Sequence, residues 1–205
     1  MPHLTAHTNV PTVIDEPAAT HPATWQRTLL RWMVSFAGYP LGGFAALLLT
    51  GPVDTLAAAL TGGLVTGAVL GAVQVWAMGH ARPRPVAWVS ATSVGLATGL
   101  ALGASLVHYR TGLADLIAQG AATGLVVGAA QAAVLLPRLG RLTLAWPVAV
   151  SGAWATGWAV TTAGGIQVDE QFTVFGSSGA IVAAALTAVL PLALNRHPVR
   201  AKSQS

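Results

Sequence analysis

The chain has 205 residues, of which 54% are hydrophobic and only 8% are charged. A soluble domain carries about a quarter charged residues, so this composition argues against a soluble globular protein. Cysteine is absent, which excludes disulfides, thiolate catalysis and cysteine-ligated metal sites. The formal charge of +4 is a small basic excess. In so apolar a chain it favours orientation in a bilayer, and we expect no nucleic-acid partner.

The N-terminal residues 1–30 are polar and contain no long apolar run. A secretory signal needs a basic start, an apolar stretch and a small-residue cleavage site, and none of these is present. We therefore predict a disordered cytoplasmic tail over 1–30. From Trp25 onward this tail is expected to lead into the membrane at its interface.

Six stretches with almost no charged residues follow, each long enough to cross a ~30 Å hydrocarbon core as a helix. They predict an all-α, polytopic transmembrane bundle over 31–195, followed by a basic cytoplasmic tail over 196–205. Glycines and prolines mark the breaks, and Pro137 is expected to end the fourth span. The predicted spans are 32–50, 55–78, 86–107, 113–136, 142–162 and 172–194.

The positions of arginine and lysine predict the orientation. With the N-terminus inside, nine of the ten basic residues fall on the cytoplasmic side and only Arg110 falls outside. This asymmetry is what the positive-inside rule requires, so both termini are expected in the cytoplasm. Five tryptophans at the same boundary are interpreted as an aromatic belt: Trp25, Trp32, Trp76, Trp88 and Trp146.

The spans also carry an internal repeat. TGAVLGAVQ at 66–74 matches TGLVVGAAQ at 123–131, and the third and fifth spans match around Trp88 and Trp146. The sixth span fits more loosely, with Leu186 in the place of the glutamine. Because each repeat contains two spans, we predict three parallel two-helix hairpins, unlike the inverted repeats of many transporters.

Glycines spaced four residues apart line one face of three spans. Such a face lets two helix backbones approach closely in lipid, where no hydrophobic drive brings helices together. We expect these glycines to form packing seams, the alternative being that some line a permeation path. They are Gly63, Gly67, Gly71, Gly95, Gly99, Gly103, Gly120, Gly124 and Gly128.

Gln74 and Gln131 are candidate polar positions inside the membrane, each about one turn from the cytoplasmic end of its span. An amide in lipid must find a partner. We interpret both as hydrogen-bonded links between neighbouring hairpins. The alternative is a polar site for a solute or ion at the inner mouth of the bundle.

Signals for catalysis or metal binding are weak. GSSG at 176–179 fits the G-x-S-G pattern of rhomboid intramembrane proteases, but no histidine base follows it on a membrane helix. Ser177 and Ser178 are therefore expected to cap a helix. Arg110 and Asp115 are expected to form an exposed pair. The histidines do not cluster, so we expect no catalytic residue, no metal site and no cofactor.

The GxxxGxxQ runs that end at Gln74 and Gln131 alternate with tryptophan- and glycine-rich helices such as 154–158. This alternation resembles a pattern in uncharacterised bacterial multi-pass membrane proteins. The resemblance extends over roughly 30–195, apart from the glutamine missing in the sixth span. It implies a repeated helical-hairpin bundle and carries no activity with it.

These observations predict a non-enzymatic integral protein of the bacterial cytoplasmic membrane. We expect an accessory or assembly subunit, or a binder of an apolar ligand between helices. Its partners would be membrane lipids, together with another membrane protein or that ligand. The alternative is a small transporter or channel for an ion or small solute, which the hairpin repeat and the two glutamines favour.

Overall fold

The computed structural model describes residues 24–165 and 172–197, and within these ranges it contains helices and connecting turns but no strand. The predicted all-α class is therefore confirmed for the described part of the chain. Most of the predicted tail over 1–30 and of the basic tail over 196–205 lies outside the described residues.

Within the described ranges, five helical segments are long and apolar enough to cross a membrane. These five segments are those expected of a multi-pass membrane protein. The fourth segment has 51 residues and covers both the fourth and the fifth predicted spans, so six crossings stay a prediction, as do three hairpin repeats. The segments are Trp25–Thr50, Leu56–Ala81, Pro85–Leu106, Leu113–Ala163 and Ser177–Arg196.

The first segment is not one continuous α-helix. α1 (Thr24–Val34) is followed by the 3-10 turn η1 (Ser35–Ala37) and then by α2 (Gly38–Thr50). Pro40 explains the break, because a proline cannot donate to the carbonyl four residues earlier and its ring crowds that carbonyl. The chain leaves α2 at Gly51, whose φ of 74° suits a residue without a side chain.

Two long helices follow. The hydroxyl of Thr55 accepts a hydrogen bond from the backbone N–H of Ala58 at 3.1 Å, and this cap begins α3 (Leu56–Met78). α3 ends in the 3-10 turn η2 (Gly79–Ala81). α4 (Pro85–Leu106) begins on a proline, which the first helical turn tolerates because its N–H would be unpaired there.

The next two helices are α5 (Leu113–Leu139) and α6 (Trp146–Ala163), joined by the 3-10 turn η3 (Gly140–Ala145). The prediction that the fourth span ends at Pro137 is wrong, because the helix includes this proline and continues to Leu139. A proline this close to a helix end removes a single backbone bond, and the helix tolerates the loss.

The 51-residue segment folds back on itself at η3. A Cβ built on Gly120 would touch Trp158, whereas one built on Gly128 would touch Pro147. Residue numbers therefore rise along α5 as they fall along α6, and the two helices pack antiparallel. The same test makes α3 and α4 antiparallel neighbours, with Gly63 against Ala97 and Gly71 against Val89.

The last segment is broken as well. α7 (Ser177–Leu186) and α8 (Val189–Arg196) are separated by a turn at Thr187. Pro191 explains this break in the same way as Pro40 explains the first, because the residue four positions earlier is Thr187. The predicted single span over 172–194 is therefore two shorter helices.

Residues 172–176 precede α7 without helical structure. Phe175 in this stretch is buried and stacks on Tyr39, with ring centroids 5.1 Å apart. Its ring also meets Trp154 and Trp158 edge-on at 5.3 and 6.0 Å. Such tilted aromatic contacts add to the stabilisation from burial, so this cluster fixes the entry to α7 against α6.

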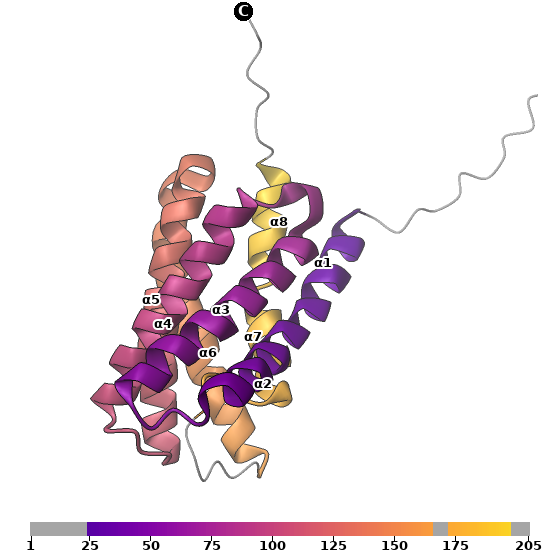
Figure 1. The fold of residues 1–205 in the computed structure, drawn as a ribbon. Coiled ribbons are helices and arrows are strands. Elements are labelled where there is room, and N and C mark those ends of the chain that lie inside the picture. The colour runs from indigo at the N-terminus through magenta and orange to yellow at the C-terminus, as the bar shows by residue number, and fades with distance from the viewer. Residues whose placement is uncertain (1–23, 166–171, 198–205) are drawn as a thin grey trace, which may run out of the picture.

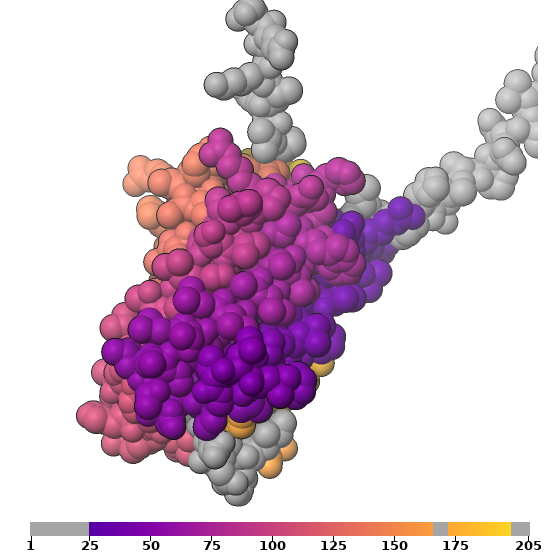
Figure 2. Space-filling model, viewed as in Figure 1, coloured from indigo at the N-terminus to yellow at the C-terminus, as the bar shows by residue number. Residues whose placement is uncertain are grey.

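The helices close into a ring. From α2 to α7 each packs against its neighbours in sequence, and α7 returns to η1 and α1 (Figure 1). Both ends of the described chain lie at one end of the bundle. The space-filling view shows a continuous surface over the helices that face the viewer (Figure 2).

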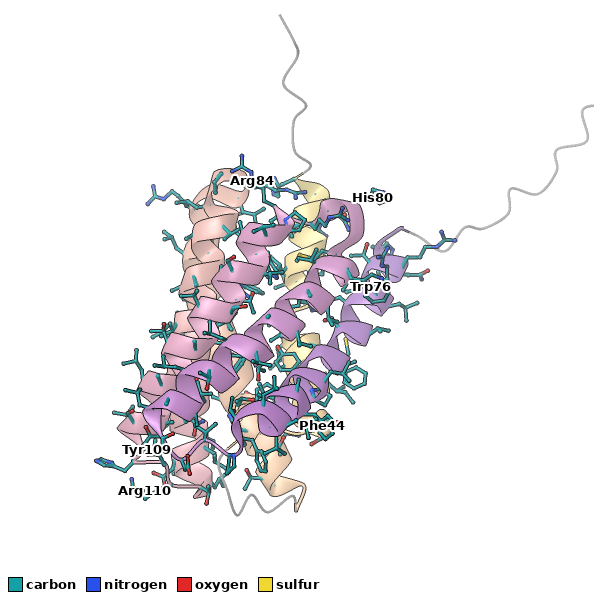
Figure 3. The ribbon with its side chains drawn as sticks, in the orientation of Figure 1. Phe44, Trp76, His80, Arg84, Tyr109 and Arg110 are labelled. Atoms are coloured by element: carbon teal, nitrogen blue, oxygen red, sulfur yellow. The ribbon has the colours of Figure 1, made fainter. Side chains whose placement is uncertain are left out.

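The two ends of the bundle differ in charge (Figure 3). We call the end that holds both termini of the described chain the basic end, and the opposite end, with Asp54, Arg110 and Asp115, the acidic end. The described residues place no carboxylate at the basic end. Its cations are Arg27, Arg31, Arg82, Arg84, Arg138, Arg141 and Arg196.

Between these ends the outer surface is strongly apolar. Large hydrophobic side chains are exposed on every helix that faces outward, a pattern that a water-soluble monomer rarely shows. A lipid environment would cover this surface without cost. The exposed residues include Leu41, Phe44, Leu48, Leu49, Leu60, Leu64, Leu102, Leu106, Leu125, Leu142 and Val148.

Candidate functional site

Gln74 and Gln131 are both buried in the bundle. Each accepts a hydrogen bond from a tryptophan of the next helix: Trp88 Nε1 donates to Gln74 Oε1, and Trp146 Nε1 donates to Gln131 Oε1, both at 3.0 Å. Gln131 Nε2 also donates to Thr92 Oγ1 at 3.1 Å. The amides thus link α3 to α4, and α5 to both of its neighbours.

A third tryptophan completes the pattern with a different partner. Trp32 Nε1 donates to the carbonyl of Ala184 at 3.0 Å and lies 3.4 Å from Thr187 Oγ1. Leu186, which the sequence alignment put in the glutamine's place, is exposed, and Thr187 is buried instead. The alignment is wrong by one residue, because the turn before α8 directs Thr187 inward.

These side chains form what we call the central polar layer, defined by Gln74, Gln131, Thr187, Trp32, Trp88 and Trp146. A cavity lined by all of these side chains except Trp88, together with apolar residues such as Leu70 and Val127, leaves about 10 Å³ for the centre of a water molecule. A polar cavity needs roughly that space, ~10–15 Å³, to hold one water. Gln74, Gln131 and Thr187 line this cavity, so their side chains offer polar atoms to such a water.

The interpretation of five tryptophans as an interfacial belt is wrong for three of them. Trp25 and Trp76 are each 54% exposed, as a belt requires. Trp32, Trp88 and Trp146 are at most 8% exposed and donate inside the bundle. A buried indole N–H needs a hydrogen-bond partner, and the central polar layer supplies one to each of these rings.

The nine glycines of the predicted seams lie at close contacts between helices. A Cβ built on any of them would come within 3.0 Å of an atom of a neighbouring helix. For Gly67 this atom is the Cα of Ser93, and for Gly124 it is the carbonyl oxygen of Val150. The glycine-bearing face of each helix is therefore in contact with a neighbouring helix, as expected for a packing seam.

Two threonines of the repeat bond across the same helix contacts. Thr66 Oγ1 donates to the carbonyl of Gly42, and Thr123 Oγ1 donates to the carbonyl of Gly99, both at 3.2 Å. Thr173 Oγ1 lies 2.8 Å from Thr66 Oγ1 and can donate to it. The two threonines therefore make equal contacts at equivalent positions of the matching segments 66–74 and 123–131.

Gln119 is a buried polar residue that the sequence analysis missed. It is 1% exposed and lies against Gly103 of α4, and neither atom of its amide has a hydrogen-bond partner in the described part of the chain. Thr161 Oγ1 and Ser178 Oγ are also buried without a hydrogen-bond partner among the described residues. Buried polar groups usually bind protein or water, so these three sites are candidates for bound water.

Arg138 was counted in the sequence only as a cytoplasmic charge, but it organises the basic end. Its Nη1 donates to the carbonyl of Ala81 at 2.6 Å, and its Nη2 and Nε donate to the carbonyls of Leu194 and His197 at 2.5 and 2.6 Å. The last carbonyls of a helix lack helical partners, so Arg138 caps α8 and joins it to η2.

The expected pair at the acidic end is present, with Arg110 Nη2 2.9 Å from Asp115 Oδ1. The guanidinium is 64% exposed, so the pair contributes little to stability. The expectation that Ser177 or Ser178 caps α7 is wrong, since Gly176 is the N-cap and no side chain caps this helix.

Within 24–165 and 172–197, no three His, Asp or Glu side chains lie close enough together to hold a metal ion. Comparisons with protein families, curated proteins and solved structures returned no match to this chain. Its function must therefore be inferred from the geometry above.

Proposed function

We propose that this chain is a non-enzymatic protein of the bacterial cytoplasmic membrane that serves as an accessory or assembly subunit. The supporting observation is the closed interior, where glycine seams bring helix backbones into contact and the central cavity has room for one water. An apolar ligand does not fit in that cavity. We therefore expect partners and apolar ligands at the outer surface or at the clefts of the basic end.

The proposal includes six spans with both termini in the cytoplasm. Its support is the reversal of Leu113–Ala163 at η3, which turns one apolar segment into two antiparallel helices of membrane-spanning length. The arginines of the basic end supply the charge asymmetry that would hold this end in the cytoplasm.

Reporter fusions test this topology. Fusions after Gly79, Gly140 and Ser205 are expected to report a cytoplasmic location, and fusions near Pro52, Arg110 and Gln167 an external one. Gln167 and Ser205 lie outside the described residues, so their fusions also extend the test beyond the structure. A cytoplasmic signal from the Gln167 fusion would contradict six spans.

Isolation of the full chain from its own membrane in a mild detergent tests the accessory role. We expect a second membrane protein to co-purify in a fixed ratio to the chain, because the apolar outer surface is the main surface available for contact. An unrelated multi-pass protein carrying the same tag is the control. Recovery of the chain as a monomer without a partner would contradict the proposal.

A small transporter or channel is the second candidate. The observation that favours it is the central polar layer, where two glutamines and a threonine line a small cavity within the ring of helices, together with the amide of Gln119, which has no hydrogen-bond partner among the described residues. Flux across proteoliposomes separates the two candidates. If the correctly inserted protein carries none of a broad panel of ions and small solutes, this candidate is excluded.

A further inference from the structure

Two clefts open side by side at the basic end. The first, of ≈ 800 Å³, lies between the start of α1, the end of α3 and α8. The second, of ≈ 1280 Å³, lies between the start of α4, the end of α5 and the end of α8. Both clefts are lined by His80 and Arg196, so they share a wall.

Each cleft has an apolar part and a cationic part. Ala77, Met78 and Leu192 line the first, and Ala87, Ala133 and Val134 line the second. The cationic side chains of the two clefts are Arg27, Arg31, Arg82, Arg84, Arg138 and Arg196.

Among the described residues no carboxylate lines either cleft, and the two acidic residues in these ranges, Asp54 and Asp115, lie at the other end of the bundle. Arg31 and Arg138 donate to backbone carbonyls, which hold their positions without neutralising their charge. The arginines therefore leave a positive field over two openings with apolar walls.

We propose that these two clefts bind the headgroup of an anionic phospholipid. A phosphate would meet the guanidinium groups, while the acyl chains would follow the apolar walls toward the lipid-facing surface. Basic pockets between helices at the cytoplasmic face bind such headgroups. Because the clefts adjoin at His80 and Arg196, a lipid with two phosphates can place one in each. We therefore expect diphosphatidylglycerol to bind better than phosphatidylglycerol.

Arg84 and Arg196 are the residues to change. Both are exposed, and neither side chain hydrogen-bonds to a described residue, so replacing them removes no contact that stabilises the described fold. Arg84 points outward at the basic end (Figure 3). The test variant is Arg84→Gln with Arg196→Gln. The matched control, Arg110→Gln with Arg141→Gln, makes the same change in charge outside both clefts.

The experiment is native mass spectrometry of the full chain in a neutral detergent, titrated with tetraoleoyl diphosphatidylglycerol. Dioleoylphosphatidylglycerol, dioleoylphosphatidylcholine and inorganic phosphate are separate arms. An arginine near a membrane surface changes lipid affinity about fivefold, so the test variant should bind diphosphatidylglycerol roughly 25-fold more weakly. The control variant should bind it no more than about fivefold more weakly than the wild type, because Arg141 is its one change at the basic end and lines neither cleft.

Three results would overturn the proposal: equal binding of diphosphatidylglycerol by the wild type and the test variant, binding of phosphatidylcholine as strong as that of diphosphatidylglycerol, or equally strong binding of inorganic phosphate alone. The last would identify a site for free phosphate. If the double variant does not fold, Arg84→Gln and Arg196→Gln are each titrated alone with diphosphatidylglycerol. The inference rests on the proposed membrane insertion but not on a protein partner, so loss of lipid binding with an intact partner complex would leave the accessory role standing.

Discussion

Replacing Gly67 by alanine is expected to destabilise the protein by ~1–3 kcal/mol, the cost of overpacking a tight core. The new Cβ would lie 2.5 Å from the Cα of Ser93 and 2.8 Å from the carbonyl oxygen of Thr92. Both are backbone atoms of α4, so relief requires the two helices to move apart. The measurement is the thermal midpoint of the purified protein in detergent.

Gly152 provides the matched control, because a Cβ built there meets nothing within 4 Å. Alanine is a better helix former than glycine by about 1 kcal/mol, so Gly152→Ala should be neutral or slightly stabilising. The two substitutions are chemically identical, and the structure predicts opposite signs. A Gly67→Ala protein as stable as the wild type would show that α3 and α4 do not touch at this glycine.

The seams could be predicted from the sequence because glycine at every fourth position of an apolar helix creates a flat face, and close packing is its main use in lipid. The partners of that face could not be predicted. Gly120 meets the ring of Trp158, whereas Gly63 meets the backbone of Ala97, and only the folded chain decides between them.

The two helix breaks could have been predicted from the sequence. Pro40 and Pro191 each lie inside a predicted span, and each disturbs the carbonyl four residues earlier. Apolar length alone concealed both breaks, because neither Ser35–Ala37 nor the turn at Thr187 and Ala188 contains a charged residue. The second break matters most for the site, since it places Thr187, and not Leu186, in the central polar layer.

The tryptophan–glutamine bonds carry a partial signal in the sequence. Gln74 precedes Trp88 by 14 residues and Gln131 precedes Trp146 by 15, and this near-equal spacing across two hairpins could have paired them. Trp32 and Thr187 are 155 residues apart in the sequence, so their contact depends on the closure of the ring of helices and could not be predicted from spacing. The carbonyl partners of Arg138 lie 56 to 59 residues away and were hidden for the same reason.

Replacing Gln131 by leucine is expected to have the second large effect. It removes the acceptor for Trp146 Nε1 and the donor to Thr92 Oγ1. A buried polar group left without a partner costs ~1–3 kcal/mol, so unfolding should become easier by at least that amount. Gln74→Leu removes one such bond and should cost less. Both are measured as shifts in thermal midpoint.

A double-mutant cycle with Trp146→Phe shows whether the bond itself is responsible. Phenylalanine removes the indole N–H, so the pair of changes leaves no orphaned donor at this position. The two single effects should therefore exceed the effect of the double change by ~0.5 kcal/mol or more, as expected for side chains in contact. Additive effects would mean that the amide and the indole stabilise the fold independently.

The same Gln131→Leu protein also separates structure from transport. If the amide links helices, stability falls and any flux through the remaining folded molecules persists. If the amide binds a solute in the central cavity, flux disappears at temperatures where the variant is still folded. Flux lost without a change in thermal midpoint would therefore favour the transporter, because a hydrogen-bonded link between helices cannot be removed from the bundle without weakening it.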